Sequence, residues 1–377
     1  MSLTPRKLNR ATLGRQMLLR RESLDVAQAV RRVVALQAQQ PASPYLALWN
    51  RLADFDPADL DAAFAGRVVV KATLMRITLH AVHADDWPEF HNAMVPRLRA
   101  ARLYDLRFRS SGLSIANADA LLPPLATFVA RPRTGAEIQD MLQARLGERK
   151  KGVWWALRSF APVQHAPTGK PWSYDTRSSF IAAQGTLGPE SHGQSVQSLL
   201  LRYLRGFGPA SAQDITQFTF LTRDVVMQAV NALGDRVERL AGPGGATLFD
   251  VPGAPLPPED AKAPPRLLPM WDNILLAYAD RSRVVPPEYR KVIFRRNGDV
   301  LPALLVDGYV AGVWRPIEAG IEATAFHRLD DDAWEELAAE ARALVAFLAN
   351  REPTVYHRYG HWWDKGLPSA EVRVLPG

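Results

Sequence analysis

The chain has 377 residues, a length that suggests two or three compact units, and 47% of its residues are hydrophobic, which is enough for a packed core. It contains no cysteine, so disulfides, iron–sulfur clusters, thiolate zinc sites and a cysteine nucleophile are excluded. We find no apolar run of membrane-spanning length and no secretory signal, and we therefore expect a cytoplasmic protein without membrane contact.

Positive charge is unevenly distributed along the chain. Basic residues outnumber acidic ones by 46 to 39, and eight of the 46 are lysine, so arginine dominates. Residues 1–110 hold 17 basic and ten acidic residues, whereas residues 316–350 hold two basic and eight acidic ones. Arginine pairs bidentately with phosphate, so this asymmetry favours a nucleic-acid partner, although a GC-rich genome would also raise the arginine content.

The N-terminal third predicts helices followed by two strands. Residues 10–39 have a helical pattern, with Ser23 as the cap of a helix whose buried stripe is formed by Val26, Val30 and Val33. Residues 68–74 and 77–82 are typical of strands, with an interruption at residues 75–76. Helices followed by a strand pair are the order of a winged helix.

The same order returns twice. Thr134 and Glu137 predict a capping box, after which we expect residues 160–165 to pair with residues 172–174. Later, Ser211 and Thr222 predict the starts of helices 212–219 and 223–233, which is a helix-turn-helix pattern.

The C-terminal third begins with a loop and ends with a helix. Residues 242–265 are rich in proline and glycine and predict a surface loop or linker. Asp307-Gly308 predicts a hairpin turn, and a capping box of Asp332 and Glu335 predicts an amphipathic helix at residues 334–348. We therefore expect an α+β protein of three units, 1–130, 131–195 and 196–377.

The segment Leu36-Gln37-Ala38-Gln39-Gln40-Pro41 is the most informative one for chemistry. Gln37 continues the buried stripe, and Pro41 forces Gln40 out of helical geometry. Residues two apart share a face in an extended chain, so Gln37 and Gln39 can converge where the helix unwinds. The alternative is that both amides only bond loose carbonyl groups at a helix end.

Other catalytic signals are weak. His357 and His361 are spaced for zinc if helical, but Gly360 interrupts the pattern and no carboxylate lies at a ligand spacing nearby, so we expect no metal. Glycine-rich nucleotide-binding motifs and Gly-x-Ser-x-Gly do not occur, and we expect no cofactor.

Several segments together resemble one family. They are Leu36–Gln39, Ser43–Trp49, Gly206–Ala210, Leu267–Asp272, Leu276–Arg281 and the hairpin Leu304–Trp314. Each match is short, but they follow one another in the order found in the winged-helix DNA glycosylases of the AlkZ and YcaQ type, with the greater likeness to the AlkZ type. The resemblance implies three tandem winged helix-turn-helix units around a concave channel for duplex DNA.

The resemblance also implies an activity and its residues. It implies hydrolytic, monofunctional excision of N7-alkylated purines, including bulky adducts and interstrand crosslinks, in base excision repair and in self-resistance to a DNA-alkylating natural product. The family's Gln-apolar-Gln/Asp signature maps onto Gln37 and Gln39, and the chain departs from the Asp form, which argues against a carboxylate general base. Arg281, Arg315, Asp307 and Gly308 lie in family-like blocks and are expected to contact DNA.

Two amides suit a labile lesion. An N7-alkylguanine is cationic and leaves as a neutral base, so we expect Gln37 and Gln39 to position water at C1′ and to favour the cationic sugar by fixed dipoles. The alternative is a non-catalytic winged-helix transcription regulator, and a third possibility is a protein that sequesters a drug. No heptad seam is visible, so we expect a monomer that is nucleoid-associated in the cytoplasm.

Overall fold

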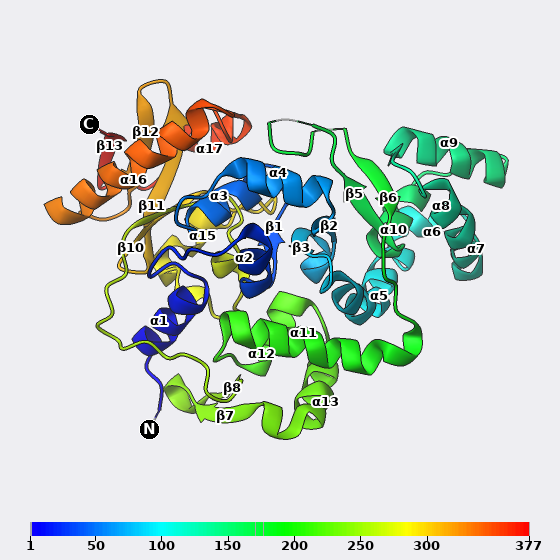
Figure 1. Ribbon diagram of the computed structural model, residues 1–377, viewed down its shortest axis with the longest axis horizontal. Helices are drawn as coiled ribbons and strands as arrows, with labels where there is room; N and C mark the ends of the chain where they lie inside the picture. The colour runs from blue at the N-terminus through cyan, green and yellow to red at the C-terminus, as the bar shows by residue number, and fades with distance from the viewer. Residues whose placement is uncertain (1, 170, 176, 377) are drawn as a thin grey trace.

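The computed structural model describes residues 2–169, 171–175 and 177–376. Helices and strands alternate in three successive groups, each of which is a set of helices followed by a strand pair, before a C-terminal sheet (Figure 1). The mixed α and β class that the sequence predicts is confirmed.

The first group contains a short strand where the sequence predicts helix. Its elements are α1 (Pro5–Arg15), α2 (Val26–Arg32), β1 (Leu36–Gln37), α3 (Ser43–Trp49), α4 (Pro57–Ala65), β2 (Val69–Thr73) and β3 (Leu79–His83). Asp25, not Ser23, caps α2, since its side chain accepts a hydrogen bond from the Gln28 amide. The helix ends at Arg32 because Val34 adopts a left-handed backbone (φ 74°), and the chain continues extended into β1.

The second group begins with a long helix. Its elements are α5 (Trp87–Leu103), α6 (Leu106–Arg109), α7 (Ile115–Ala120), α8 (Leu122–Phe128), β4 (Arg133–Thr134), α9 (Gly135–Leu146), α10 (Val153–Phe160), β5 (Val163–Ala166) and β6 (Ser179–Ala182). The capping box of Thr134 and Glu137 is confirmed. The predicted pairing with residues 172–174 is wrong: β5 pairs with β6, because Trp172 and Tyr174 are core side chains that pack against Tyr45 and Phe64.

One antiparallel sheet joins these two groups. Its strand order is β1-β3-β2-β5-β6-β4, and β2 meets β5 where Lys71 lies opposite His165. The sheet therefore crosses the boundary between residues 130 and 131, and the division into units 1–130, 131–195 and 196–377 stays a prediction.

The third group has the predicted helix-turn-helix. Its elements are α11 (His192–Phe207), α12 (Ala212–Thr219), α13 (Arg223–Leu233), β7 (Glu238–Ala241) and β8 (Thr247–Asp250). Ser211 caps α12 and Thr222 caps α13, as the sequence predicts. The predicted loop 242–265 is partly wrong, because β8 lies within it and pairs with β7 as the wing of this group.

A five-stranded sheet follows. The remaining elements are β9 (Arg266–Leu268), α14 (Asn273–Leu276), α15 (Arg290–Ile293), β10 (Ala303–Val306), β11 (Tyr309–Ile317), β12 (Gly320–Ala325), α16 (Asp331–Ala349), α17 (His361–Asp364) and β13 (Glu371–Leu375). The sheet order is β13-β12-β11-β10-β9. Helix α16 lies beside this sheet (Figure 1) and is capped by Asp330, not by Asp332, so the helix starts earlier than predicted.

Buried ion pairs hold distant segments together. Arg15 of α1 forms a bidentate pair with Asp250 of β8, and Arg51 after α3 forms one with Asp272 before α14. All four side chains are at most 3% exposed. Segments 269–273 and 35–37 are thereby held close enough to share a site.

Candidate active site

Gln37 lies at the edge of the six-stranded sheet, on β1 opposite His80 of β3. It is 4% exposed. Its Oε1 accepts a hydrogen bond of 2.9 Å from Nη2 of Arg76. Because a guanidinium only donates, this contact fixes which end of the amide faces Arg76.

Gln39 follows β1 and is exposed. Ala38 continues the strand pairing by donating its amide to the Leu79 carbonyl (2.8 Å), and Oε1 of Gln39 accepts from the Leu79 amide (3.1 Å). The chain is therefore extended through Ala38 and bends at Gln39, and the convergence of Gln37 and Gln39 stays a prediction. No hydrogen bond joins the two amides, and neither Nε2 has a protein acceptor in the part of the chain that the structure describes.

Arg76 is the centre of this site, and sequence analysis missed it. It lies in the 3-10 turn η1 (Met75–Ile77) between β2 and β3, with a left-handed backbone (φ 53°). Its Nη2 also donates to Oδ1 of Asn273 (3.3 Å), and its Nη1 donates to the Phe218 carbonyl (3.2 Å). The predicted interruption of the strands at residues 75–76 was the only signal that pointed to it.

His80 completes the cluster in its neutral form. Nδ1 lies 3.1 Å from the Thr78 carbonyl and Nε2 lies 3.2 Å from Nη2 of Arg76, so Nδ1 carries the proton and Nε2 accepts. Burial, reinforced by the Arg76 cation, holds the pKa of His80 well below its usual range. Asn273 ties the cluster to the chain before β1 by donating Nδ2 to the Ala35 carbonyl (2.5 Å).

Two arginines of this region have no acidic partner within the described residues. Burial, with a smaller contribution from the neighbouring Arg281 cation, lowers the pKa of Arg76 to about 9. Arg281 lies over the Phe294 ring at 3.8 Å, and burial together with Arg290 lowers its pKa to about 10. Both side chains remain cations at neutral pH, so the region attracts an anion such as a DNA phosphate.

The other predicted DNA contacts differ in their surroundings. Arg315 on β11 forms an ion pair with Glu322 of β12 (2.8 Å), which neutralises its charge. Asp307 bonds to Arg6 and Arg10, and the Gly308 carbonyl accepts from Asn9 (2.8 Å). The Asp307-Gly308 turn is confirmed, but it is packed against α1, and these contacts give no support to a role in probing DNA.

Space beside Gln37 is limited. A cavity of about 10 Å³ is lined by Gln37, Gln16, Arg51 and residues 269–273. This is near the lower limit for one water molecule. The described residues contain no group of three or more metal-ligating side chains, and none of the described helices is long and apolar enough to cross a membrane.

Comparisons with known proteins identify the family. The model of the family described as DNA glycosylase AlkZ-like matches residues 30–347, which is most of the chain. The chain therefore belongs to the AlkZ-like DNA glycosylase family.

Two further comparisons each cover about nine-tenths of the chain. An interstrand DNA cross-link repair glycosylase of Streptomyces sahachiroi is 24% identical over 361 residues, which cover 88% of this chain and 94% of that protein. The solved structure of the Streptomyces sahachiroi DNA glycosylase AlkZ superimposes with a TM-score of 0.77 at 21% identity, covering 90% of this chain and 96% of that one. The fold is thus that of a DNA glycosylase, and a transcription regulator is not favoured.

Proposed function

We propose that this DNA glycosylase excises N7-alkylated purines from duplex DNA, including bulky adducts and the two halves of interstrand crosslinks. The name of the Streptomyces relative supports the crosslink activity. The observation that carries the proposal is the hydrogen bond between Gln37 and Arg76, because a polar amide then lies beside a cation that has no acidic partner among the described residues and that has Arg281 as a neighbouring cation.

The chemistry requires little acid assistance. When the bond between C1′ and N9 breaks, its electron pair goes to the purine and neutralises the cation that alkylation created. Water then forms the new bond to C1′ of the positively charged sugar, and its proton passes to solvent. Normal purines leave poorly by this route, so selectivity follows from the leaving group.

We assign the two glutamines as hydrogen-bond donors. Both Oε1 atoms are already held, by Arg76 and by the Leu79 amide, which leaves both Nε2 groups available. An amide N–H that donates to one lone pair of a water leaves the other lone pair for C1′. The expected stabilisation of the cationic sugar by the amide dipoles requires amide oxygens that face the DNA. Both oxygens are instead held by protein donors, so that expectation has no support in this orientation.

Exposure distinguishes the two glutamines. Gln39 is exposed and is the group that meets DNA directly, whereas Gln37 acts through its amide edge beside the small cavity. A base tied to both strands cannot rotate freely into a deep pocket, so an exposed amide suits a crosslinked substrate. The Asp307-Gly308 turn, being packed on α1, is not required in this proposal.

One experiment tests the function. Duplex DNA with a single N7-methylguanine is incubated with the protein, and released base and abasic strand are measured. We expect release by the wild type, loss of release when Gln37 and Gln39 are both replaced by alanine, and little change in DNA affinity. Release by the double variant would remove the assignment of the glutamines.

The reaction class, the oligomeric state, the location and the biological role are part of the same proposal. We propose that the enzyme hydrolyses the bond without cleaving the strand, since the described residues that form hydrogen bonds with Gln37, Gln39 and Arg76 include no lysine amine to form a Schiff base. We also propose a monomer that acts in the cytoplasm and protects its host from a DNA-alkylating natural product. An intact strand before alkali treatment is the measurement that checks the hydrolytic class.

A further inference from the structure

A large pocket among the described residues lies apart from Gln37. It has a volume of about 640 Å³, within the range of small-molecule sites, and is bounded by α1, the starts of α12 and α13, the β7–β8 hairpin and the 3-10 turn η5 (Arg281–Arg283). None of the residues that contact Gln37 lines it. It shares no lining residue with the small cavity beside Gln37.

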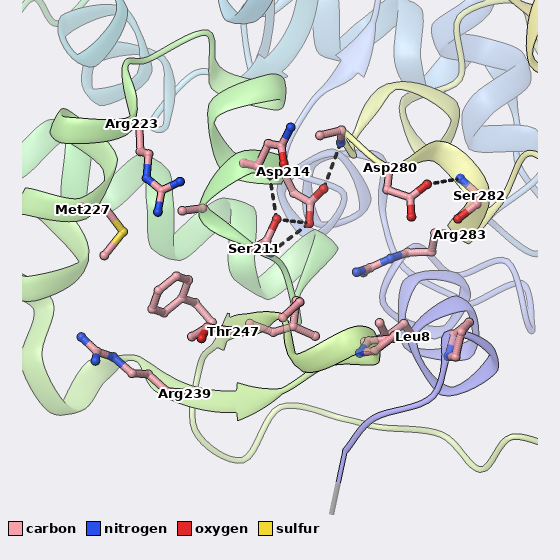
Figure 2. A pocket seen from close by; sticks show the side chains of 18 residues that line it. Leu8, Ser211, Asp214, Arg223, Met227, Arg239, Thr247, Asp280, Ser282 and Arg283 are labelled. Carbon is pink, nitrogen blue, oxygen red and sulfur yellow. Dashed lines mark hydrogen bonds between the residues drawn. The ribbon is translucent and has the colours of Figure 1, made fainter. Parts of the chain in front are cut away.

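One side of the pocket carries positive charge. Figure 2 shows Arg223 and Arg239 on the same side, with Met227 between them. Both arginines are exposed, and neither forms an ion pair or a hydrogen bond within the described chain; Arg239 lies 6.0 Å over the ring of Phe249. Two free guanidiniums facing one space form a place for a carboxylate or a phosphate.

The acidic side chains of the pocket do not neutralise these arginines. Asp214 accepts hydrogen bonds from the backbone amides of Ser211 and Ala279 (both 2.9 Å), and Asp280 accepts from that of Ser282 (2.9 Å). Asp280 lies on the opposite side of the pocket from Arg223 and Arg239 (Figure 2). The two aspartates shape the wall by capping local turns, and the positive charge of Arg223 and Arg239 on the other side is not neutralised.

The rest of the wall is apolar. Leu8, Leu248 and Phe249 are buried side chains that reach it, and Met227 adds a polarisable thioether. A ligand that matches both the apolar wall and the two arginines has a flat aromatic body against Phe249 and Met227 and an acidic group between Arg223 and Arg239.

We propose that this pocket binds a small aromatic anion, that is, an aromatic ring system bearing one carboxylate or phosphate group. The site is connected to the glycosylase centre through two shared elements. Helix α12 has its first turn in the pocket and Phe218, near its other end, against Arg76. The turn η5 places Arg283 in the pocket and Arg281 near Arg76.

Calorimetric titration of the full chain tests the proposal without relying on glycosylase activity. The probes are biphenyl-4-carboxylate, its neutral amide, and deoxyadenosine monophosphate with deoxyadenosine as its neutral counterpart. We expect at least one anion to bind and its neutral counterpart to bind at least about 10-fold more weakly, since each charge-assisted contact contributes that order of affinity. The two anion arms distinguish a carboxylate ligand from a nucleotide.

Variants locate the site. We expect R223Q and R239Q each to weaken binding about 10-fold, and M227W to abolish it by filling the cavity, while R236Q, an exposed arginine outside the pocket, binds as the wild type does. Thermal unfolding confirms that each variant is folded, as expected for arginines without an ion pair. Failure of both anions to bind, equal binding of the neutral probes, binding unaffected by R223Q and R239Q, or loss of binding when unmodified duplex DNA is added would overturn the proposal.

Discussion

Exchanging Gln37 for glutamate alters a single atom of the candidate site, because the two side chains have the same shape and the amide nitrogen becomes an oxygen. If Gln37 acts as a donor, Gln37→Glu removes that function and keeps the contact with Arg76. If Gln37 acts through its oxygen, the same substitution keeps or improves the function. The two roles therefore predict opposite outcomes.

The structure sets the expected change in the free energy of unfolding of Gln37→Glu. The 2.9 Å bond between Gln37 and Arg76 becomes an ion pair, and a bond to a charged group contributes about 1.5–3 kcal/mol against about 0.5–1.5 kcal/mol for a neutral one. Because Arg76 has no carboxylate within the described residues, the new pair offsets the burial of the glutamate. We expect the free energy of unfolding to stay constant or rise by about 1 kcal/mol, which is about 1 °C in Tm for a chain of this length.

The excision rate of Gln37→Glu, in contrast, is expected to fall. Loss of one preorganised donor lowers the rate of a chemical step by about 100-fold. Single-turnover excision of N7-methylguanine, followed by alkaline cleavage and gel analysis, gives this rate, and fluorescence anisotropy gives DNA affinity, which we expect to change little. Gln37→Met is the control that loses both donor and acceptor, and it should lose rate and stability together. A Gln37→Glu variant that excises within threefold of the wild type would refute the donor role.

Three further predictions follow from individual side chains. Arg281→Gln should reduce the slope of log affinity for DNA against log salt concentration by about 0.9, whereas Arg315→Gln, whose charge Glu322 neutralises, should change it less; equal slopes would contradict the assignment of Arg281. Gly308→Ala should destabilise the protein more than Gly298→Ala in urea unfolding, because both have positive φ but an added Cβ comes within 2.5 Å of a neighbouring leucine only at Gly308. Burial lowers the pKa of His91 to about 4, so its unfolded form binds more protons below pH 6.5 and stability should fall by about 2 kcal/mol between pH 7 and pH 5; a His91→Gln variant should show a flatter pH profile.

Local signals in the sequence were sufficient for the starts of three helices, α9, α12 and α13. The capping box of Thr134 and the caps Ser211 and Thr222 each lie where predicted, because a cap and the turn it closes are within four residues. Strand pairing was harder, since a partner is chosen by the whole core. The buried aromatics Trp172 and Tyr174 look like strand residues but fill the space against Tyr45 and Phe64.

The candidate site was predictable in part for a similar reason. Gln37 and Gln39 are two residues apart, so a short pattern identifies them. Arg76 and Asn273 come from a turn between strands and from a segment about 200 residues later, and only the folded chain brings them to Gln37. A residue that joins the site only through contacts with distant segments has no local sequence pattern that identifies it.

The presence or absence of an acidic partner distinguishes the structural arginines from those of the candidate site. Arg15 and Arg51 are buried and each has a bidentate aspartate, so their charges hold segments together and are not available to a ligand. Arg76 and Arg281 are less buried but have no acidic partner within the described residues, so their mutual repulsion is relieved only when an anion arrives. Binding of a phosphate between them would therefore stabilise the turn that carries Arg76, and with it the orientation of Gln37. On this view the net positive charge of the chain is a poor guide to where an anion binds, and the absence of a counter-ion at a particular arginine is a better one.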